Sequence, residues 1–344
     1  MKFEIFTPIV IHELGQRSNQ EDSVFPAKGV AASSDRLFLV CDGMGGHARG
    51  EVASANVVDA FTAWVMQHTL PDGRVTDSII VDALLSAHQR LNTLDDGAEH
   101  KMGTTLTMVC LHSAGVSMGH VGDSRIYHVR PSQRAILYKS IDHSLVYELY
   151  RNGVISHDEM VTSPHRNVIT RAVMPGKDSV DKIDIAHTTN VLPGDYFLLC
   201  SDGMLENMTD AQLLEVLCSH SPCEAIASTL VTMTQDNKDN HSAVLIKIKS
   251  VIAEPADKRH PNDEHISPYN DVIATARNAS TWATPIIPEP DDDNRSKPTN
   301  NAAPAMGIAG GSKKAKSKLW LLLSMLLTAI AIVVAVVLFC NSVM

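Results

Sequence analysis

Acidic residues stand at the ends of apolar runs that have the length and composition of buried strands. Four acids share this placement: Asp42 after 37–41, Asp123 between 117–121 and 125–129, Asp202 after 196–200, and Asp239 before 243–248. A strand end holds a carboxylate rigidly. Glycine beside three of these acids permits a tight turn or the approach of a ligand to the backbone. The pattern therefore predicts a sheet-containing domain that gathers several carboxylates.

The strand-like runs come in groups, and helices lie between the groups. Apolar residues recur at a spacing of three to four over 50–68 and 78–94, which predicts two amphipathic helices. Ser221-Pro-Cys-Glu224 has the pattern of a capping box with proline in the first helical position. Because the strands do not alternate strictly with helices, we predict an α+β fold with antiparallel sheets.

Composition and charge narrow the class of protein. The chain has 344 residues, is 44% hydrophobic and carries a net charge of −10. This excludes wholesale disorder, and it argues against a protein that coats nucleic acid, which needs clustered lysine and arginine. The six cysteines include no CxxC pair, which argues against a thiol-ligated zinc site and fits a reducing compartment.

Three regions follow one another along the chain. We predict a globular domain over 1–250, a disordered linker over 251–317 that holds 8 of the 16 prolines, and a transmembrane helix over 318–341. Residues 319–340 carry no charge, and four lysines lie between 313 and 318. By the positive-inside rule we expect a single-pass membrane protein whose globular domain lies in the cytoplasm.

Converging carboxylates repel one another and need a counter-charge to stay ionised. Hard divalent cations such as Mg²⁺ and Mn²⁺ supply that charge and prefer oxygen ligands. Two such ions roughly 4 Å apart can orient a water for in-line attack on phosphorus. Arg17, four and five residues before Glu21 and Asp22, is the candidate to hold a phosphate. Any one of these acid–glycine motifs alone is more often only a turn.

The ordered set of motifs resembles the metal-dependent PPM-type (type 2C) serine/threonine protein phosphatases, most closely the bacterial members. The resemblance covers nearly all of residues 5–249. It rests on these segments: Arg17…Glu21-Asp22, Asp42-Gly-Met-Gly-Gly-His47, Gly103-Thr-Thr105, Gly122-Asp-Ser-Arg125, Asp142-His-Ser144, Ser201-Asp-Gly203 and Asp239-Asn240. It implies a four-layer α-β-β-α sandwich of two antiparallel sheets flanked by helices. Residues 149–171 are similar to the flap of bacterial members.

The resemblance also implies roles for individual residues and two Mn²⁺ or Mg²⁺ ions, with a weaker third. Its implied assignments are Asp42 bridging both ions, the Gly43 carbonyl on one ion, Asp202 and Asp239 on the other, Glu21 and Asp22 acting through waters, Arg17 on the substrate phosphate, and Asp123 with Asp202 at the third ion. Two positions depart from the pattern. Met44 stands where some members have a histidine proposed as the general acid, and Glu206 replaces an aspartate of the third ion's shell.

The leading hypothesis is a phosphatase that hydrolyses phosphoserine and phosphothreonine on proteins by attack of a metal-bridged hydroxide, at the cytoplasmic membrane face. Its partners would be phosphorylated proteins, such as a serine/threonine kinase and its substrates. The alternative is a catalytically weak phosphatase-like module that binds phosphoproteins in signalling, although Asp42, Asp202 and Asp239 are all retained. A regulatory switch for transcription or secretion is a third reading. A two-metal enzyme acting on nucleic acid is disfavoured because the domain is acidic.

Structural roles are expected for His120 and His143, and core packing for Cys41 and Cys200.

Overall fold

The computed structural model describes residues 1–45, 49–97, 101–176 and 182–252, all of which belong to the first of two units, Met1–Glu289. The predicted membrane-spanning segment and nearly all of the predicted linker lie outside the described residues. Within the described ranges, no helix has the length and apolar character needed to cross a membrane.

Two six-stranded sheets form the centre of the domain, and every strand pairing in them is antiparallel. The first sheet contains β1 (Lys2–Ile5), β2 (Ile9–Glu13), β8 (Arg125–Arg130), β9 (Ala135–Lys139), β11 (Tyr196–Cys200) and β12 (His241–Ile252). The second contains β3 (Asp22–Phe25), β4 (Leu37–Met44), β5 (Gly103–Thr104), β6 (Leu106–His112), β7 (Gly115–Val121) and β10 (Asp184–Thr188).

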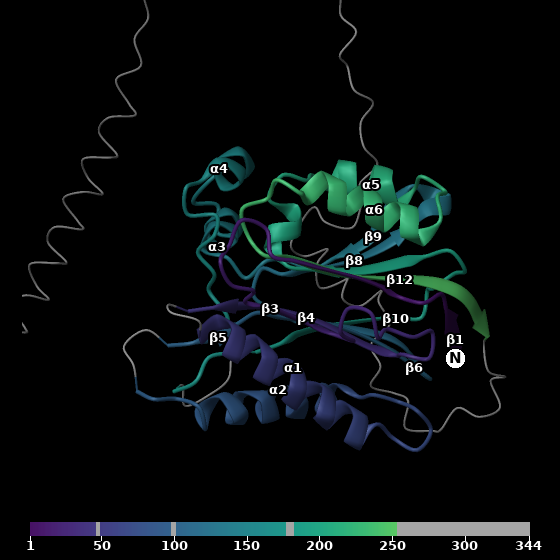
Figure 1. Cartoon of the computed structure of the whole chain (residues 1–344), viewed down its shortest axis with the longest axis horizontal. Helices are drawn as coiled ribbons and strands as arrows, with labels where there is room; N and C mark the ends of the chain where they lie inside the picture. The colour runs from purple at the N-terminus through teal and green to yellow at the C-terminus, as the bar shows by residue number, and fades with distance from the viewer. Residues whose placement is uncertain (46–48, 98–100, 177–181, 253–344) are drawn as a thin grey trace, which may run out of the picture. The chain divides into compact units, whose positions relative to one another are not determined.

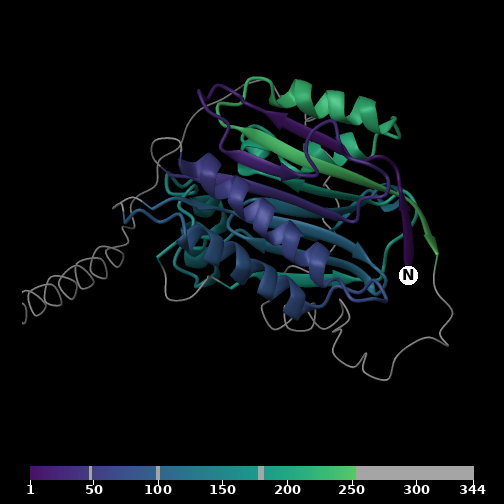
Figure 2. The same cartoon turned by 60° about the horizontal axis from the view of Figure 1, so that its bottom comes forward.

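Helices cover the outer face of each sheet, as Figures 1 and 2 show. The helices of the described residues are α1 (Arg49–His68), α2 (Asp77–Asn92), α3 (Leu145–Arg151), α4 (His157–Thr162), α5 (Asp210–Leu217) and α6 (Cys223–Thr234), with short 3₁₀ turns η1 (Pro131–Gln133) and η2 (Asp202–Leu205). α1 and α2 pack on the second sheet, and α5 and α6 pack on the first. The predicted four-layer α-β-β-α sandwich of the α+β class is therefore confirmed.

Strand β4 shows how the sequence builds these layers. Leu39 and Cys41 face α1 and α2, whereas Phe38 and Val40 face the other sheet. Alternate residues of a strand point to opposite faces, and a strand covered on both faces is apolar throughout. The same alternation in β11 sends Cys200 toward the α5–α6 layer. Both cysteines are fully buried core residues, as expected.

One local prediction differs from the structure. α6 begins at Cys223 with Pro222 in the N-cap position and no side-chain cap, so the capping box predicted at Ser221–Glu224 was wrong. Capping boxes instead begin α4 at Ser156 and α5 at Thr209. Pro222 has an extended backbone (ψ 151°) and occupies the N-cap itself, so Ser221 lies one residue before the cap.

Candidate metal centre

The predicted acids come together at one end of the two sheets. Asp22 begins β3 and is directly paired with Asp42 of β4 in the antiparallel register. Asp202 begins η2 directly after β11 and Ser201, and Asp239 lies in the connection just before β12. Asp123 lies in the turn between β7 and β8. Strands from both sheets therefore deliver one carboxylate each to a shared site.

Burial and mutual repulsion raise the pKa values of these carboxyl groups. Burial first, and then the charges of Asp22, Asp202 and Asp123, raise the pKa of Asp42 well above its ordinary value. Burial, with the charges of Asp202 and Asp239, raises the pKa of Asp22 to about 7. Such shifts mean that all these groups cannot be ionised together unless a cation is present.

The same causes act on the other two buried acids. The pKa of Asp123 rises to about 7 through burial and the charges of Asp202 and Asp142. The pKa of Asp202 is raised mainly by burial, and the charge of Asp239 adds to the effect. Each of these four carboxyl groups therefore has its pKa raised in part by the charge of another acid of the cluster.

The donor set fits a hard divalent cation. Asp22 is 4% exposed, and its Oδ1 has no hydrogen-bond partner within the described part of the chain, while Oδ2 accepts from Ser201 Oγ at 2.9 Å. A buried carboxylate oxygen without a donor is costly unless a cation meets it. Carboxylate oxygens are the ligands that Mg²⁺ and Mn²⁺ prefer. Asp42, Asp202 and Asp239 are therefore the residues that would hold the ions, with Asp22 beside them.

The backbone at Gly43 is closely packed. A Cβ on Gly43 would lie 2.2 Å from the Gly50 carbonyl oxygen and 2.4 Å from the Glu21 carbonyl oxygen, so no larger residue fits. Gly43 N donates to the Glu21 carbonyl oxygen at 3.1 Å. This contact ties β4 to the loop that carries Glu21, whose side-chain pKa is raised mainly by burial.

Arg17 lies at the exposed edge of the cluster. Its Nη2 donates to Asp239 Oδ2 at 2.7 Å, and the two side chains are 53% and 38% exposed. The hydrogen bond to Asp239, with the charges of Asp239, Glu21 and Asp42, raises the pKa of Arg17. A permanently charged guanidinium at the mouth of an acidic site is placed to receive an anionic substrate group.

Residues named only as parts of motifs turn out to fix the backbone of Asp42. Thr105 Oγ1 accepts from Asp42 N at 2.9 Å, and Thr105 N and Thr104 Oγ1 both donate to the Asp42 carbonyl oxygen at 2.9 Å. Ser201 fixes a side chain instead, because its Oγ donates to Asp22 Oδ2. Sequence reasoning missed these roles, and the only signal was the position of each residue beside a strand end.

Glu206, which stands where some family members have an aspartate of the third ion's shell, bonds to backbone N–H groups. Its Oε2 accepts from Lys238 N at 2.7 Å and from Asp239 N at 3.4 Å. The carboxylate thus accepts from two backbone N–H groups just before β12. These bonds connect the segment after Asp202 with the segment that carries Asp239. This oxygen is already satisfied by backbone N–H groups, which argues against a role at a third ion.

A separate group of polar side chains connects the turn that carries Asp123 with Arg171 at the end of the flap. Ligand atoms of His120, His143 and Asp184 lie within 4.8 Å of one another, which is a possible metal geometry. However, Arg171 Nη1 already lies 3.2 Å from His143 Nε2 and 3.0 Å from Asp184 Oδ1. His143 Nδ1 also accepts from Gly122 N at 3.0 Å. The guanidinium supplies the positive charge, so this group supports the structural roles expected of both histidines.

A serine–histidine–aspartate chain between β7, β10 and α2 has the connectivity of a nucleophile and its base. Ser117 Oγ lies 2.9 Å from His187 Nδ1, and His187 Nε2 lies 2.7 Å from Asp77 Oδ1. Ser117 is fully buried, however, and it also bonds to His112 Nε2 at 2.8 Å. A substrate cannot reach this buried hydroxyl, so the three hydrogen-bonded residues hold α2 against the sheet.

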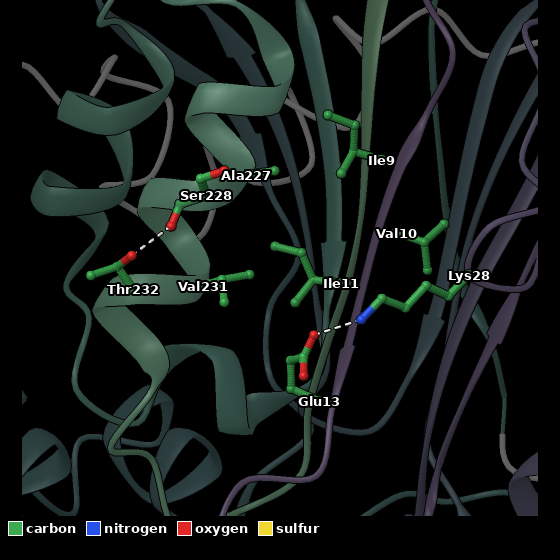
Figure 3. A pocket seen from close by; sticks show the side chains of 9 residues that line it. All are labelled: Ile9, Val10, Ile11, Glu13, Lys28, Ala227, Ser228, Val231 and Thr232. Carbon is green, nitrogen blue, oxygen red and sulfur yellow. Dashed lines mark hydrogen bonds and ion pairs between the residues drawn. The ribbon is translucent and has the colours of Figure 1, made fainter.

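A groove of about 370 Å³ lies between β2 and α6 (Figure 3). Aliphatic side chains such as Ile11 and Val231 line it, and the Glu13–Lys28 ion pair, at 2.6 Å, closes one side. None of the clustered aspartates contributes to its walls. The groove is therefore distinct from the candidate metal centre.

The chain is similar to known protein phosphatases over most of its described residues. A family model described as "Protein phosphatase 2C" matches residues 13–245. Protein phosphatase PhpP of Streptococcus pneumoniae is 30% identical over 71% of this chain and 98% of its own length. Serine/threonine phosphatase stp of Listeria innocua is 30% identical over 64% of this chain and 88% of its own. The crystal structure of the catalytic domain of the phosphatase PstP with two manganese ions is 26% identical, with a TM-score of 0.55 over 72% of this chain and 99% of that one.

Proposed function

The chain belongs to the protein phosphatase 2C family and is a metal-dependent protein serine/threonine phosphatase, and we propose that its clustered aspartates hold two Mn²⁺ or Mg²⁺ ions. The observation that carries this proposal is the buried pairing of Asp22 with Asp42 beside Asp202, where Asp22 Oδ1 meets no donor among the described residues. A cation pair is the counter-charge that such a cluster lacks.

Residues of the chain would have different roles at this centre. Asp42, Asp202, Asp239 and the Gly43 carbonyl would hold the ions, with Glu21 and Asp22 beside them. When bound, the ions supply positive charge and lower the pKa of water, so that a nucleophile is available at neutral pH. A weaker third ion at Asp123 and Asp202 belongs to the same proposal.

Arg17 orients the substrate in this mechanism. The half-exposed guanidinium at the edge of the aspartate cluster would bind the phosphate of phosphoserine or phosphothreonine. Its bond to Asp239 keeps it directed across the mouth of the site. Met44 lies next to Gly43 and offers no proton, so a group other than residue 44 supplies the proton that the leaving alkoxide takes up.

The proposed location is the cytoplasmic face of a membrane. It rests on the uncharged segment 319–340 and on the lysines at 313, 314, 316 and 318 before it. The substrates would then be phosphoproteins at or near that face, including a membrane-bound serine/threonine kinase. Deletion of 319–344 should move the protein from the membrane to the soluble fraction, and full function of the deleted form in cells would contradict the proposal.

The test of the reaction is phosphate release from a phosphothreonine peptide, with and without Mn²⁺, by the wild type and by Asp42→Ala and Asp239→Ala. We expect metal-dependent release that both variants lose while retaining the wild-type circular dichroism spectrum. Peptide binding without release by a folded, metal-loaded protein would contradict the proposal and would support the phosphoprotein-binding module.

A further inference from the structure

The loop between β2 and β3 carries both Arg17 and Glu21 but contains no helix or strand of its own. A loop side chain as long and exposed as Arg17 has many rotamers, and its single ion pair is worth little by itself. The position of the guanidinium therefore depends on how firmly the backbone of this loop is held.

One buried side chain on the opposite segment holds that backbone. Asn240, just before β12, is 4% exposed. Its Nδ2 donates to the Leu14 carbonyl oxygen at 2.8 Å and to the Asn19 carbonyl oxygen at 3.0 Å. Its Oδ1 accepts from Glu21 N at 2.9 Å. The three bonds use both amide N–H donors and the carbonyl acceptor, so the three partners fix the orientation of the amide.

The loop is also packed closely on the segment next to Asn240. Gly15 has a φ of +61°, and a Cβ there would lie 2.1 Å from the Asp239 carbonyl oxygen. Gln16 N donates to the Lys238 carbonyl oxygen at 3.2 Å. The loop and the segment that carries Asp239 are therefore packed together, and Asn240 is the buried side chain that bonds to the loop at three backbone positions.

We propose that Asn240 is a positioning residue for the phosphatase reaction: its amide holds the loop so that Arg17 and Glu21 stand in register with Asp239. This inference rests on the proposed function, because it assigns Arg17 to the substrate phosphate. Asn240 does not touch the substrate. It acts through the backbone of the loop, and an error of about 1 Å in such a position can cost up to a hundredfold in rate.

The test is a double-mutant cycle in the full-length protein, using Asn240→Ala, Arg17→Ala and the double variant. We expect Asn240→Ala to raise KM for a phosphothreonine peptide, and the inhibition constant for inorganic phosphate, by about tenfold. The Mn²⁺ concentration for half-maximal activity should change by less than about twofold. In the Arg17→Ala background, Asn240→Ala should change KM by less than about twofold, because the guanidinium that binds the phosphate is absent.

Asn237 provides a matched control. It is a buried asparagine three residues earlier, and its Nδ2 donates to the Gly203 carbonyl oxygen at 2.6 Å rather than to the loop. Asn237→Ala should lower stability while having the same effect on KM in both backgrounds. If Asn240→Ala behaves in the same way, with equal effects in both backgrounds, then its role is structural only and the inference is overturned.

Two measurements separate this inference from the proposed function. Hydrogen exchange at the Glu21 amide should be slow in the wild type and fast in Asn240→Ala, whether or not the protein hydrolyses any substrate. The same cycle can be measured as the affinity for inorganic phosphate by calorimetry. An inactive wild type would contradict the proposed function alone, whereas unchanged Glu21 exchange in Asn240→Ala would contradict the inference.

Discussion

Asp22 and Asp42 lie directly opposite each other on β3 and β4, two acids in the position where neighbouring strands normally place compatible side chains. The pairing is unfavourable in the absence of a cation, because burial and like charge raise the pKa of both groups. Asp202 and Asp239 add to the repulsion. This repulsion between buried carboxylates is the strongest physical indication that the site binds a divalent cation.

Removing one charge should stabilise the metal-free protein. In a chelator at pH 8, Asp42→Asn should raise the free energy of unfolding, because burial and the charges of Asp22, Asp202 and Asp123 disfavour the ionised carboxyl that the substitution removes. The same variant should lose most of the stabilisation that Mn²⁺ gives the wild type. Thermal unfolding with and without Mn²⁺ measures both effects. A less stable Asp42→Asn protein in chelator would contradict the repulsion described here.

The pH dependence of stability should carry the sign of a raised carboxyl pKa. Asp22 titrates at about 7 in the folded protein and at about 4 when unfolded. Between these values the folded state binds the extra proton, so the contribution of Asp22 to stability falls as pH rises from about 4 to about 7. Above that window the contribution changes little.

Comparison with Asp22→Asn isolates this contribution. The comparison is needed because burial lowers the pKa of His112 to about 4, which makes stability rise with pH over much of the same range. In chelator, the wild type should lose stability relative to Asp22→Asn between pH 5 and pH 8, as measured by urea unfolding. A difference between the two proteins that is independent of pH would be inconsistent with the raised pKa.

Arg17 should affect substrate binding more than metal binding. Loss of a charge-assisted contact costs about 1.5–3 kcal/mol, so Arg17→Ala should lower kcat/KM by about tenfold to a hundredfold. Arg17→Lys should recover little, because lysine lacks the planar fork that matches phosphate. Mn²⁺ affinity should not fall, since Asp239 loses a competing cation. Steady-state kinetics at several Mn²⁺ concentrations separate the two effects, and weaker Mn²⁺ binding would contradict the assignment.

Glu206 should act as an acceptor for the backbone and not as a charge. Glu206→Gln keeps an acceptor for Lys238 N and Asp239 N, so its stability should stay near that of the wild type. Glu206→Ala leaves the exposed Lys238 N to water and removes the acceptor of Asp239 N, so it should cost about 0.5–1.5 kcal/mol. Guanidinium unfolding of the two variants tests this. A loss in Glu206→Gln as large as in Glu206→Ala would instead point to a role for the negative charge.

Much of the fold follows from local patterns, and the exceptions have physical causes. The runs at 37–41 and 196–200 are apolar on both faces, and the structure places both as central strands. The edge strand β2 and the short strands β3 and β5 were not predicted. Their residues are mixed in polarity, and they are strands only because β12 or β4 pairs with them.

The same division holds for the site. Asp42 and Asp202 could be named because each lies at or just beyond the end of an apolar strand. The position of Glu206 could not be predicted, since its partners are backbone N–H groups of residues 238 and 239, more than thirty positions away. The role of Asn240 was missed for a similar reason, because Leu14 and Asn19 are more than two hundred residues away in sequence.

Calorimetric titration of the metal-free full-length protein with Mn²⁺ tests the central claim most directly. The account predicts two ions bound per chain at the aspartate cluster, and loss of tight binding in Asp42→Asn and Asp239→Asn. Glu215→Gln, which removes an exposed α5 carboxylate that is paired with Arg134 and not with any residue of the cluster, should bind Mn²⁺ like the wild type. Absence of Mn²⁺ binding by the folded wild type, or binding unchanged in both aspartate variants, would contradict the account.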